Sequence, residues 1–127
     1  MDDERADACL PKLVSSRLPP AADDAQGVVY RIVSDGRLTE DDFRSYHELG
    51  QGLTIDPCRR CGVSVFASLA RARHRLALSP RLGTAIARGV LDASAGKTKL
   101  TDWRSGHVEW WVYVGVTRHS YFEDPVP

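Results

Sequence analysis

Long hydrophobic runs are absent from this sequence of 127 residues. The longest lies within Trp110–Val116, where Gly115 interrupts it, and it is far shorter than the roughly 20 residues that cross a bilayer. The acidic first residues also lack the apolar core of a secretion signal. We therefore expect a cytoplasmic protein with no membrane partner.

Cysteine is scarce, with three residues in the chain, and we expect these thiols to stay reduced in the cytoplasm. Cys58 and Cys61 have the spacing of half a zinc knuckle, but a tetrahedral site needs four ligands and a second Cys-x-x-Cys motif is missing. The pair is interpreted as two reduced cysteines beside a tight turn, with a redox pair or a zinc site as alternatives. The remaining candidate zinc ligands have no diagnostic spacing: Cys9, His47, His74 and His107.

Familiar catalytic and nucleic-acid-binding motifs are missing too. The sequence Gly96-Lys97-Thr98 lacks the upstream glycine of a phosphate-binding loop, and no convincing Ser/His/acid order is present. The chain has no fingerprint of a common nucleic-acid-binding fold, and its net charge is zero. Nucleic acid is therefore the less favoured partner, and whether the protein is an enzyme is left open.

Acidic residues are absent from Pro57–Leu91, which carries seven arginines. The residues before it contain twelve acidic and six basic side chains, and those after it contain five acidic and four basic ones. Such a block arrangement creates a local electric field. Either the acidic part folds back on the basic segment, or two copies pair head to tail as a homo-oligomer, or the basic segment binds an anionic partner.

Four arginines of this segment are candidates for an anion-binding face. Residues four apart on a helix point the same way, and an arginine fork pairs well with phosphate or carboxylate. The predicted partner is an acidic protein surface or a nucleotide, and a solvated helix face is the simpler alternative. The four residues are Arg59, Arg60, Arg71 and Arg75.

Five strands, one of which could instead be a turn, and two helices can be predicted from local patterns. Gly27–Val33 is rich in β-branched residues and predicts a strand, and Thr39 with Asp42 resembles a capping box that begins a helix over Leu38–Leu49. Ser68 is the expected N-cap of a second helix, Leu69–Leu78. Further strands are expected at Gly62–Phe66 (or a turn), Thr84–Leu91, Lys97–Thr101 and His107–Val116.

This order of elements predicts a single compact α+β domain, in which two helices pack on one face of a mostly antiparallel sheet. We expect residues 1–26 to be a mobile acidic N-terminal segment, 27–118 to form the α+β domain, and 119–127 to be a C-terminal tail.

The strand His107–Val116 alternates between an apolar face and an amphipathic one. His107 and Glu109 fall on the amphipathic face, where such a pair can act in proton transfer. Trp111 and Tyr113 follow on the same face and could stack on a planar ligand. A solvent-facing sheet edge is the competing interpretation.

Arg31, Ser64 and Glu109 lie on three predicted strands in that chain order. This pattern resembles ADP-ribosyltransferases of the arginine–serine–glutamate type, and the chain also looks like a small bacterial protein. The resemblance implies NAD as cosubstrate, with Arg31 on its phosphates, Ser64 supporting the nicotinamide-ribose pocket and Glu109 orienting the ribose. The match covers three short stretches, and His107 stands where the family has an acid or glutamine.

Two hypotheses of function follow. The first is a non-catalytic binding module that needs no cofactor and uses the arginine face. The second is an enzyme acting on NAD or a related nucleotide, with Arg31, Ser64, His107 and Glu109 in one cleft. A structural protein with a zinc knuckle at Cys58 and Cys61 is a further alternative.

Overall fold

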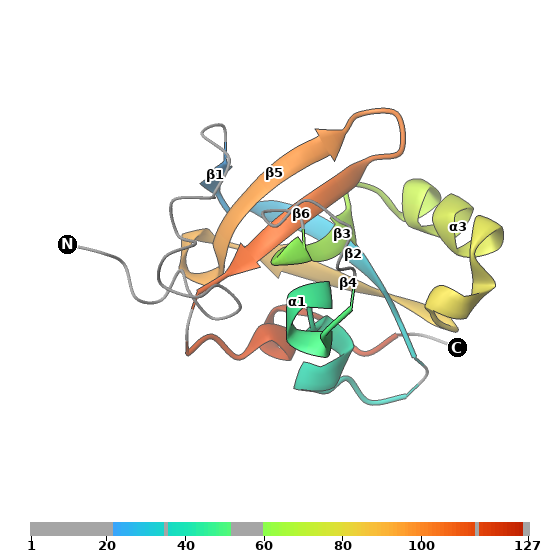
Figure 1. Cartoon of the computed structure of the whole chain (residues 1–127), viewed down its shortest axis with the longest axis horizontal. Helices are drawn as coiled ribbons and strands as arrows, with labels where there is room; N and C mark the ends of the chain where they lie inside the picture. Colours follow the sequence, from blue (N-terminus) through green and yellow to red (C-terminus); the bar gives the residue numbers. More distant parts are fainter. Residues whose placement is uncertain (1–21, 35, 52–59, 114, 126–127) are drawn as a thin grey trace.

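The computed structural model describes residues 22–34, 36–51, 60–113 and 115–125. Its strands form one antiparallel sheet of six strands in the order β1-β5-β6-β3-β2-β4 (Figure 1). The predicted α+β fold with an antiparallel sheet and two helices is confirmed. The strands are β1 (Asp23–Asp24), β2 (Gly27–Val33), β3 (Val63–Phe66), β4 (Ala85–Leu91), β5 (Gly96–Asp102) and β6 (His107–Val112). The helices are α1 (Tyr46–Leu49) and α3 (Leu69–Leu78), with short 3-10 turns η3 (Glu40–Phe43), η4 (Pro80–Leu82), η5 (Ala93–Ala95) and η6 (Arg118–Tyr121).

The main hydrophobic core lies on one face of this sheet. Trp110 of β6 is fully buried there, and it packs against Phe122 with ring centroids 6.0 Å apart. Phe43 of η3 completes the aromatic group, at 4.6 Å from Phe122. A smaller cluster of Ile32, Phe66 and Ala72 covers the other face beneath α3. The two faces are thus unequal, and the lightly covered face is the one on which a cavity forms.

The predicted helix Leu38–Leu49 is interrupted in the structure. Its capping box is present, since the backbone N–H of Thr39 donates to Asp42 Oδ2 at 2.8 Å, and Gly50 ends α1 in the left-handed conformation with φ of 68°. Between them the chain becomes extended at Arg44, and a second capping box starts at Ser45. The prediction of one continuous helix was therefore wrong.

Arginines from elsewhere in the chain explain this interruption. In a continuous helix the carbonyls of Asp42 and Phe43 would accept from backbone N–H groups four residues later. Here the Asp42 carbonyl accepts from Arg31 at 3.0 Å, and the Phe43 carbonyl accepts from Arg118 at 2.6 Å. The guanidinium groups therefore take acceptors that the helix would need.

Both ends of the described chain belong to the fold. Asp23 and Asp24, predicted to be in a mobile segment, pair with β5, and Ala25 beside them is fully buried. Residues 1–21 of that segment lie outside the described residues. Phe122, predicted to be in a tail, is a core residue, and β6 ends at Val112 rather than at residue 116. None of the helices described here is long and apolar enough to cross a membrane.

Candidate functional site

An opening in the sheet between β2 and β3 determines where the candidate site forms. These strands pair only at Tyr30 and Phe66, and continuing that register would set Ile32 opposite Ser64. Instead the guanidinium of Arg31 donates to the backbone carbonyl of Ser64 at 2.7 Å. The side chain thus takes an acceptor that a continued ladder would use, and the arginine lies at the point where the two strands separate.

Arg31 carries its positive charge in a largely desolvated position. Burial lowers the pKa of Arg31 to about 10, although Tyr46, Asp42 and Glu109 offset part of that effect. The guanidinium is therefore still charged at neutral pH. Strand alternation would place Arg31 on the core side with Val29, but it is anchored in the opening and lines the same cavity as Glu109.

Pairing of β3 with β6 brings three of the predicted site residues together. Ser64 stands opposite Glu109 in the register, and His107 follows two residues away on the same face. The His107 Nε2 atom lies 2.9 Å from Ser64 Oγ and 3.7 Å from Glu109 Oε1. The predicted convergence of Arg31, Ser64, His107 and Glu109 on one cavity is thus what the structure contains.

Thr101 joins this group through an irregularity in β5. The register with β6 shifts between Leu100 and Asp102, so that Thr101 is the extra residue of a bulge. Its hydroxyl oxygen lies 2.5 Å from His107 Nδ1 and also donates to the His107 carbonyl at 3.1 Å. Nothing in the sequence marked Thr101 as a site residue, because a bulge leaves no clear local pattern.

Gly62 makes room for the buried carboxylate at the base of the site. A Cβ atom at this position would collide with Glu109 Oε2, and the Glu109 side chain is only 4% exposed. The small residue before β3 is therefore a packing requirement of Glu109.

Gly62, Ser64, His107 and Glu109 form the floor of a cavity of about 520 Å³. Among the residues that the structure describes, the lining includes four arginines (Arg31, Arg44, Arg75 and Arg81) and two acidic residues, Asp102 and Glu109. Apolar side chains from four elements complete the lining. They are Ile32, Tyr46, Leu49, Phe66 and Leu82.

The four arginines predicted to form one face have different surroundings, and the face stays a prediction. Arg75 lines the cavity, whereas Arg71 packs at Gly106 and Arg60 donates to the Gln51 carbonyl at 2.7 Å. Arg59 lies outside the described residues. Arg81 takes a place in the cavity that the sequence did not single out, because η4 turns the chain back towards the sheet.

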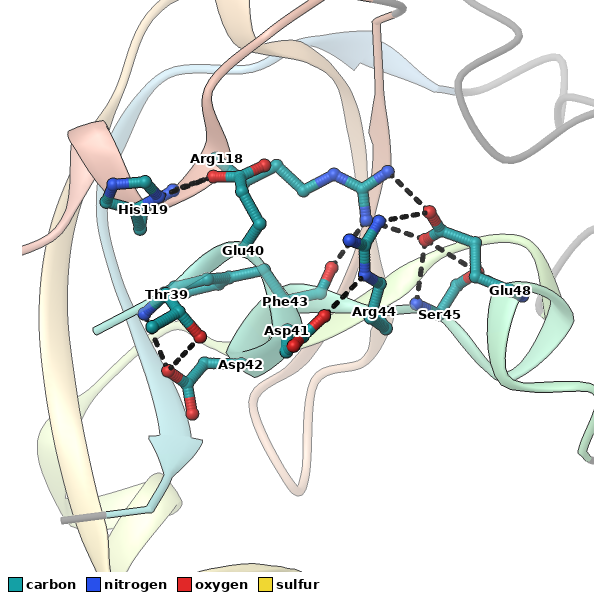
Figure 2. A network of polar contacts seen from close by, with 10 residues as sticks. All are labelled: Thr39, Glu40, Asp41, Asp42, Phe43, Arg44, Ser45, Glu48, Arg118 and His119. Atoms are coloured by element: carbon teal, nitrogen blue, oxygen red, sulfur yellow. Dashed lines mark hydrogen bonds and ion pairs between the residues drawn. The ribbon is translucent and has the colours of Figure 1, made fainter. Parts of the chain in front are cut away.

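A network of ion pairs fixes the wall that carries Arg44 (Figure 2). Arg118 donates to both carboxylate oxygens of Glu48 at 2.6 and 2.8 Å, and Arg44 lies 3.4 Å from the same carboxylate. Burial would raise the pKa of Glu48, but hydrogen bonds from Arg118 and Ser45 outweigh it and leave that pKa below its usual value. The segment between η3 and α1 is therefore held rigidly at the cavity.

The predicted stacking residues do not line the cavity, and only one of the two predicted zinc ligands is among the described residues. Trp111 and Tyr113 are buried and are not among the residues that line the cavity. Cys61 is buried, and Cys58 lies outside the described residues. In the part of the chain that the structure describes, no three His, Cys, Asp or Glu side chains are grouped as a metal site would need. A zinc site thus stays a prediction.

Comparison with known proteins adds no assignment to this geometry. No protein-family model, no curated protein and no solved structure matches the chain. The function must therefore be inferred from the cavity itself.

Proposed function

We propose that the protein binds a small anionic organic molecule of about nucleotide size in this cavity, with Arg75 and Arg81 contacting its phosphate or carboxylate group. The observation that carries the proposal is the charge of the described residues that line the cavity, which are four arginines against two acidic residues. Its volume of about 520 Å³ also suits a ligand of this size, because small-molecule sites span roughly 300–1,000 Å³.

The four arginines are not equally available to a ligand. Arg31 is bonded to two backbone carbonyls, and Arg44 is paired with Asp41 and Glu48. Within the described residues, the Arg75 and Arg81 side chains form neither an ion pair nor a hydrogen bond. These two are therefore the groups that an incoming anion would pair with.

The shape of the site favours a nucleotide over an acidic protein surface. A protein surface would meet arginines on a convex face, whereas Arg75 and Arg81 line a cavity. Phe66, Tyr46 and Leu82 offer apolar walls for a ring, which matches the mixed apolar and polar lining of small-molecule sites.

Calorimetric titration with ADP, inorganic phosphate and adenosine tests this proposal. We expect ADP to bind and its affinity to fall as salt is added, and we expect adenosine to bind much more weakly. A double variant, Arg75→Gln with Arg81→Gln, should lose at least about tenfold in affinity for ADP, because a hydrogen bond to a charged group contributes about 1.5–3 kcal/mol.

Arg73→Gln is the matched control, because Arg73 is exposed on the same helix and does not line the cavity. It should bind ADP like the unaltered protein. Equal affinities for adenosine and ADP, or equal losses in the control and the double variant, would contradict the proposal.

ADP-ribosyl transfer from NAD is a second candidate, favoured by the presence of Arg31, Ser64 and Glu109 in one cavity. In this case Glu109 would orient the ribose, and we expect slow release of nicotinamide from NAD that Glu109→Gln abolishes. Glu123→Gln is the control, since that side chain is 77% exposed. Nicotinamide release that persists unchanged in Glu109→Gln, or none at all from the unaltered protein, would exclude this candidate.

A further inference from the structure

Ser64, His107 and Thr101 form a continuous hydrogen-bonded chain, in which Ser64 and His107 line the cavity and Thr101 lies behind His107. Ser64 Oγ lies 2.9 Å from His107 Nε2, and Thr101 Oγ1 lies 2.5 Å from His107 Nδ1. Each residue comes from a different strand, β3, β6 and β5. The arrangement has no motif in the sequence, because 37 positions separate Ser64 from Thr101 along the chain.

The contacts of Thr101 allow His107 to hold its proton on the nitrogen away from Ser64. A hydroxyl has one proton, and Thr101 Oγ1 lies 3.1 Å from the His107 carbonyl and 2.5 Å from Nδ1. When Thr101 gives its proton to the carbonyl, its oxygen accepts from Nδ1–H of the neutral ring. In this tautomer the Nε2 lone pair faces Ser64 Oγ and can accept the serine proton.

Charges on both sides of this pair suit proton transfer from serine to histidine. Glu109 Oε1, at 3.7 Å from Nε2, stabilises the imidazolium that forms when the proton arrives. Arg31, bonded to the Ser64 carbonyl at 2.7 Å, lines the same cavity as Ser64, and its positive charge favours the negative charge that develops on the reacting group. Ser64 is itself only partly buried and lines the cavity.

From this geometry we infer that Ser64 is a nucleophile, activated by His107, and that it hydrolyses a carboxylic ester of a small anionic molecule. The inference rests on the proposed function only for the anionic group of the substrate, which Arg75 and Arg81 would hold. The reacting group itself needs Ser64, His107 and Thr101.

The reaction proceeds in two balanced steps. Ser64 Oγ forms a bond to the ester carbonyl carbon while its proton moves to His107 Nε2. The bond from carbon to the leaving oxygen then breaks, and that oxygen takes the proton from Nε2 to leave as an alcohol. In the second step water attacks the acyl-serine, gives a proton to Nε2, and releases the acid as Ser64 regains its proton.

Thr101 is a positioning residue in this scheme, because it acts only through His107. Thr101→Val removes the oxygen that holds Nδ1–H, so it should slow the reaction of Ser64. Thr101→Ser keeps that oxygen and should restore the rate, which a role in packing alone would not explain.

The test is covalent labelling with phenylmethylsulfonyl fluoride, an uncharged reagent that needs no anion site. Ser64 Oγ bonds to its sulfur, fluoride leaves, and the proton passes to His107. We expect one adduct per chain by intact-mass spectrometry, located on the peptide that contains Ser64. ADP binding is measured on the same preparation, so that failure of the anion site and failure of the nucleophile give different results.

Variants separate the roles of the residues. Ser64→Ala should abolish the adduct, and Ser94→Ala, which removes an exposed serine in η5, should keep it. His107→Gln should slow labelling by at least about 100-fold, in line with the loss of a general base. His107→Ala serves as a second variant in case His107→Gln does not fold. Thermal unfolding is used to check that each labelled variant is folded.

Three results would overturn the inference. They are an absence of adduct on the folded protein, an adduct on a residue other than Ser64, and labelling of a folded His107 variant at the unaltered rate.

Discussion

At the scale of single residues, Glu48 links the ionisation state of the protein to its stability. Its carboxylate accepts two hydrogen bonds from Arg118, whose side chain is only 5% exposed. The folded state therefore lowers the pKa of Glu48 below the value of 4.5 that it has when unfolded. A lowered folded pKa means that the stabilisation is complete above the unfolded value and is lost as the pH falls through the folded one.

We expect Glu48→Gln to reduce the free energy of unfolding at pH 7 by an amount on the order of 3 kcal/mol, because Arg118 is left buried without its anionic partner. Below about pH 4.5 the difference between variant and unaltered protein should shrink, since Glu48 then takes up a proton in the unfolded state, whereas the folded carboxylate keeps its charge down to its own lower pKa. Urea denaturation at pH 7 and pH 3.5 measures both effects.

Asp41→Asn is the control for this comparison. Asp41 pairs with Arg44 at 3.4 Å, but its side chain is 88% exposed, so the change should be below about 1 kcal/mol at either pH. A Glu48→Gln variant whose deficit is the same at both pH values would contradict the assigned role of this carboxylate.

At the scale of elements, the two ends of the predicted helix Leu38–Leu49 could be predicted from the sequence, but the break in its middle could not. The Thr39–Asp42 capping box and the Gly50 terminus can be predicted from neighbouring residues, and both are present. The interruption between them depends on Arg31, which contacts the Asp42 carbonyl from 11 residues away, and on Arg118, which contacts the Phe43 carbonyl from 75 residues away. Neither arginine belongs to the helix pattern, so the helix signals alone could not reveal these contacts.

Some residues of the candidate site could likewise be predicted from a sequence pattern, and others could not. His107 and Glu109 share a face because they are two apart on a strand, which alternation predicts. Thr101 enters through a bulge, and Arg81 through the turn η4, so both depend on tertiary geometry. The sequence therefore predicted the acid–base residues His107 and Glu109 of the cavity, but it did not predict that Arg81 lines the same cavity.

At the scale of the whole molecule, few of the arginines that the structure describes in the basic central segment are paired with a described carboxylate. Of its arginines that the structure describes, Arg88 alone forms an ion pair with a described residue, Glu123, at a distance of 4.0 Å. Arg75 and Arg81 turn towards the cavity instead, so that part of the segment's charge is directed at a concave site. Concentrated charge of this kind attracts small anions more effectively than charge spread over a surface.

The C-terminal segment is what completes the main core, and this gives the prediction for the molecule as a whole. Phe122 packs between Phe43 and Trp110, and its ring lies against the backbone at Gly89, where any Cβ would collide with it. Truncation of such a ring removes its burial and leaves a cavity that the rigid sheet cannot fill.

We expect Phe122→Ala to lower the free energy of unfolding by about 3–5 kcal/mol, measured by urea denaturation at pH 7. Trp103→Ala is the control, because that side chain is 73% exposed and its loss should change stability by less than about 0.5 kcal/mol. If residues 119–127 were instead a detached tail, the two variants would unfold at the same urea concentration. A large loss in Phe122→Ala alone would show that Phe122 stabilises the core on the face of the sheet opposite the cavity. Because Phe122 packs on Trp110 of β6, this core also supports the strand that carries His107 and Glu109.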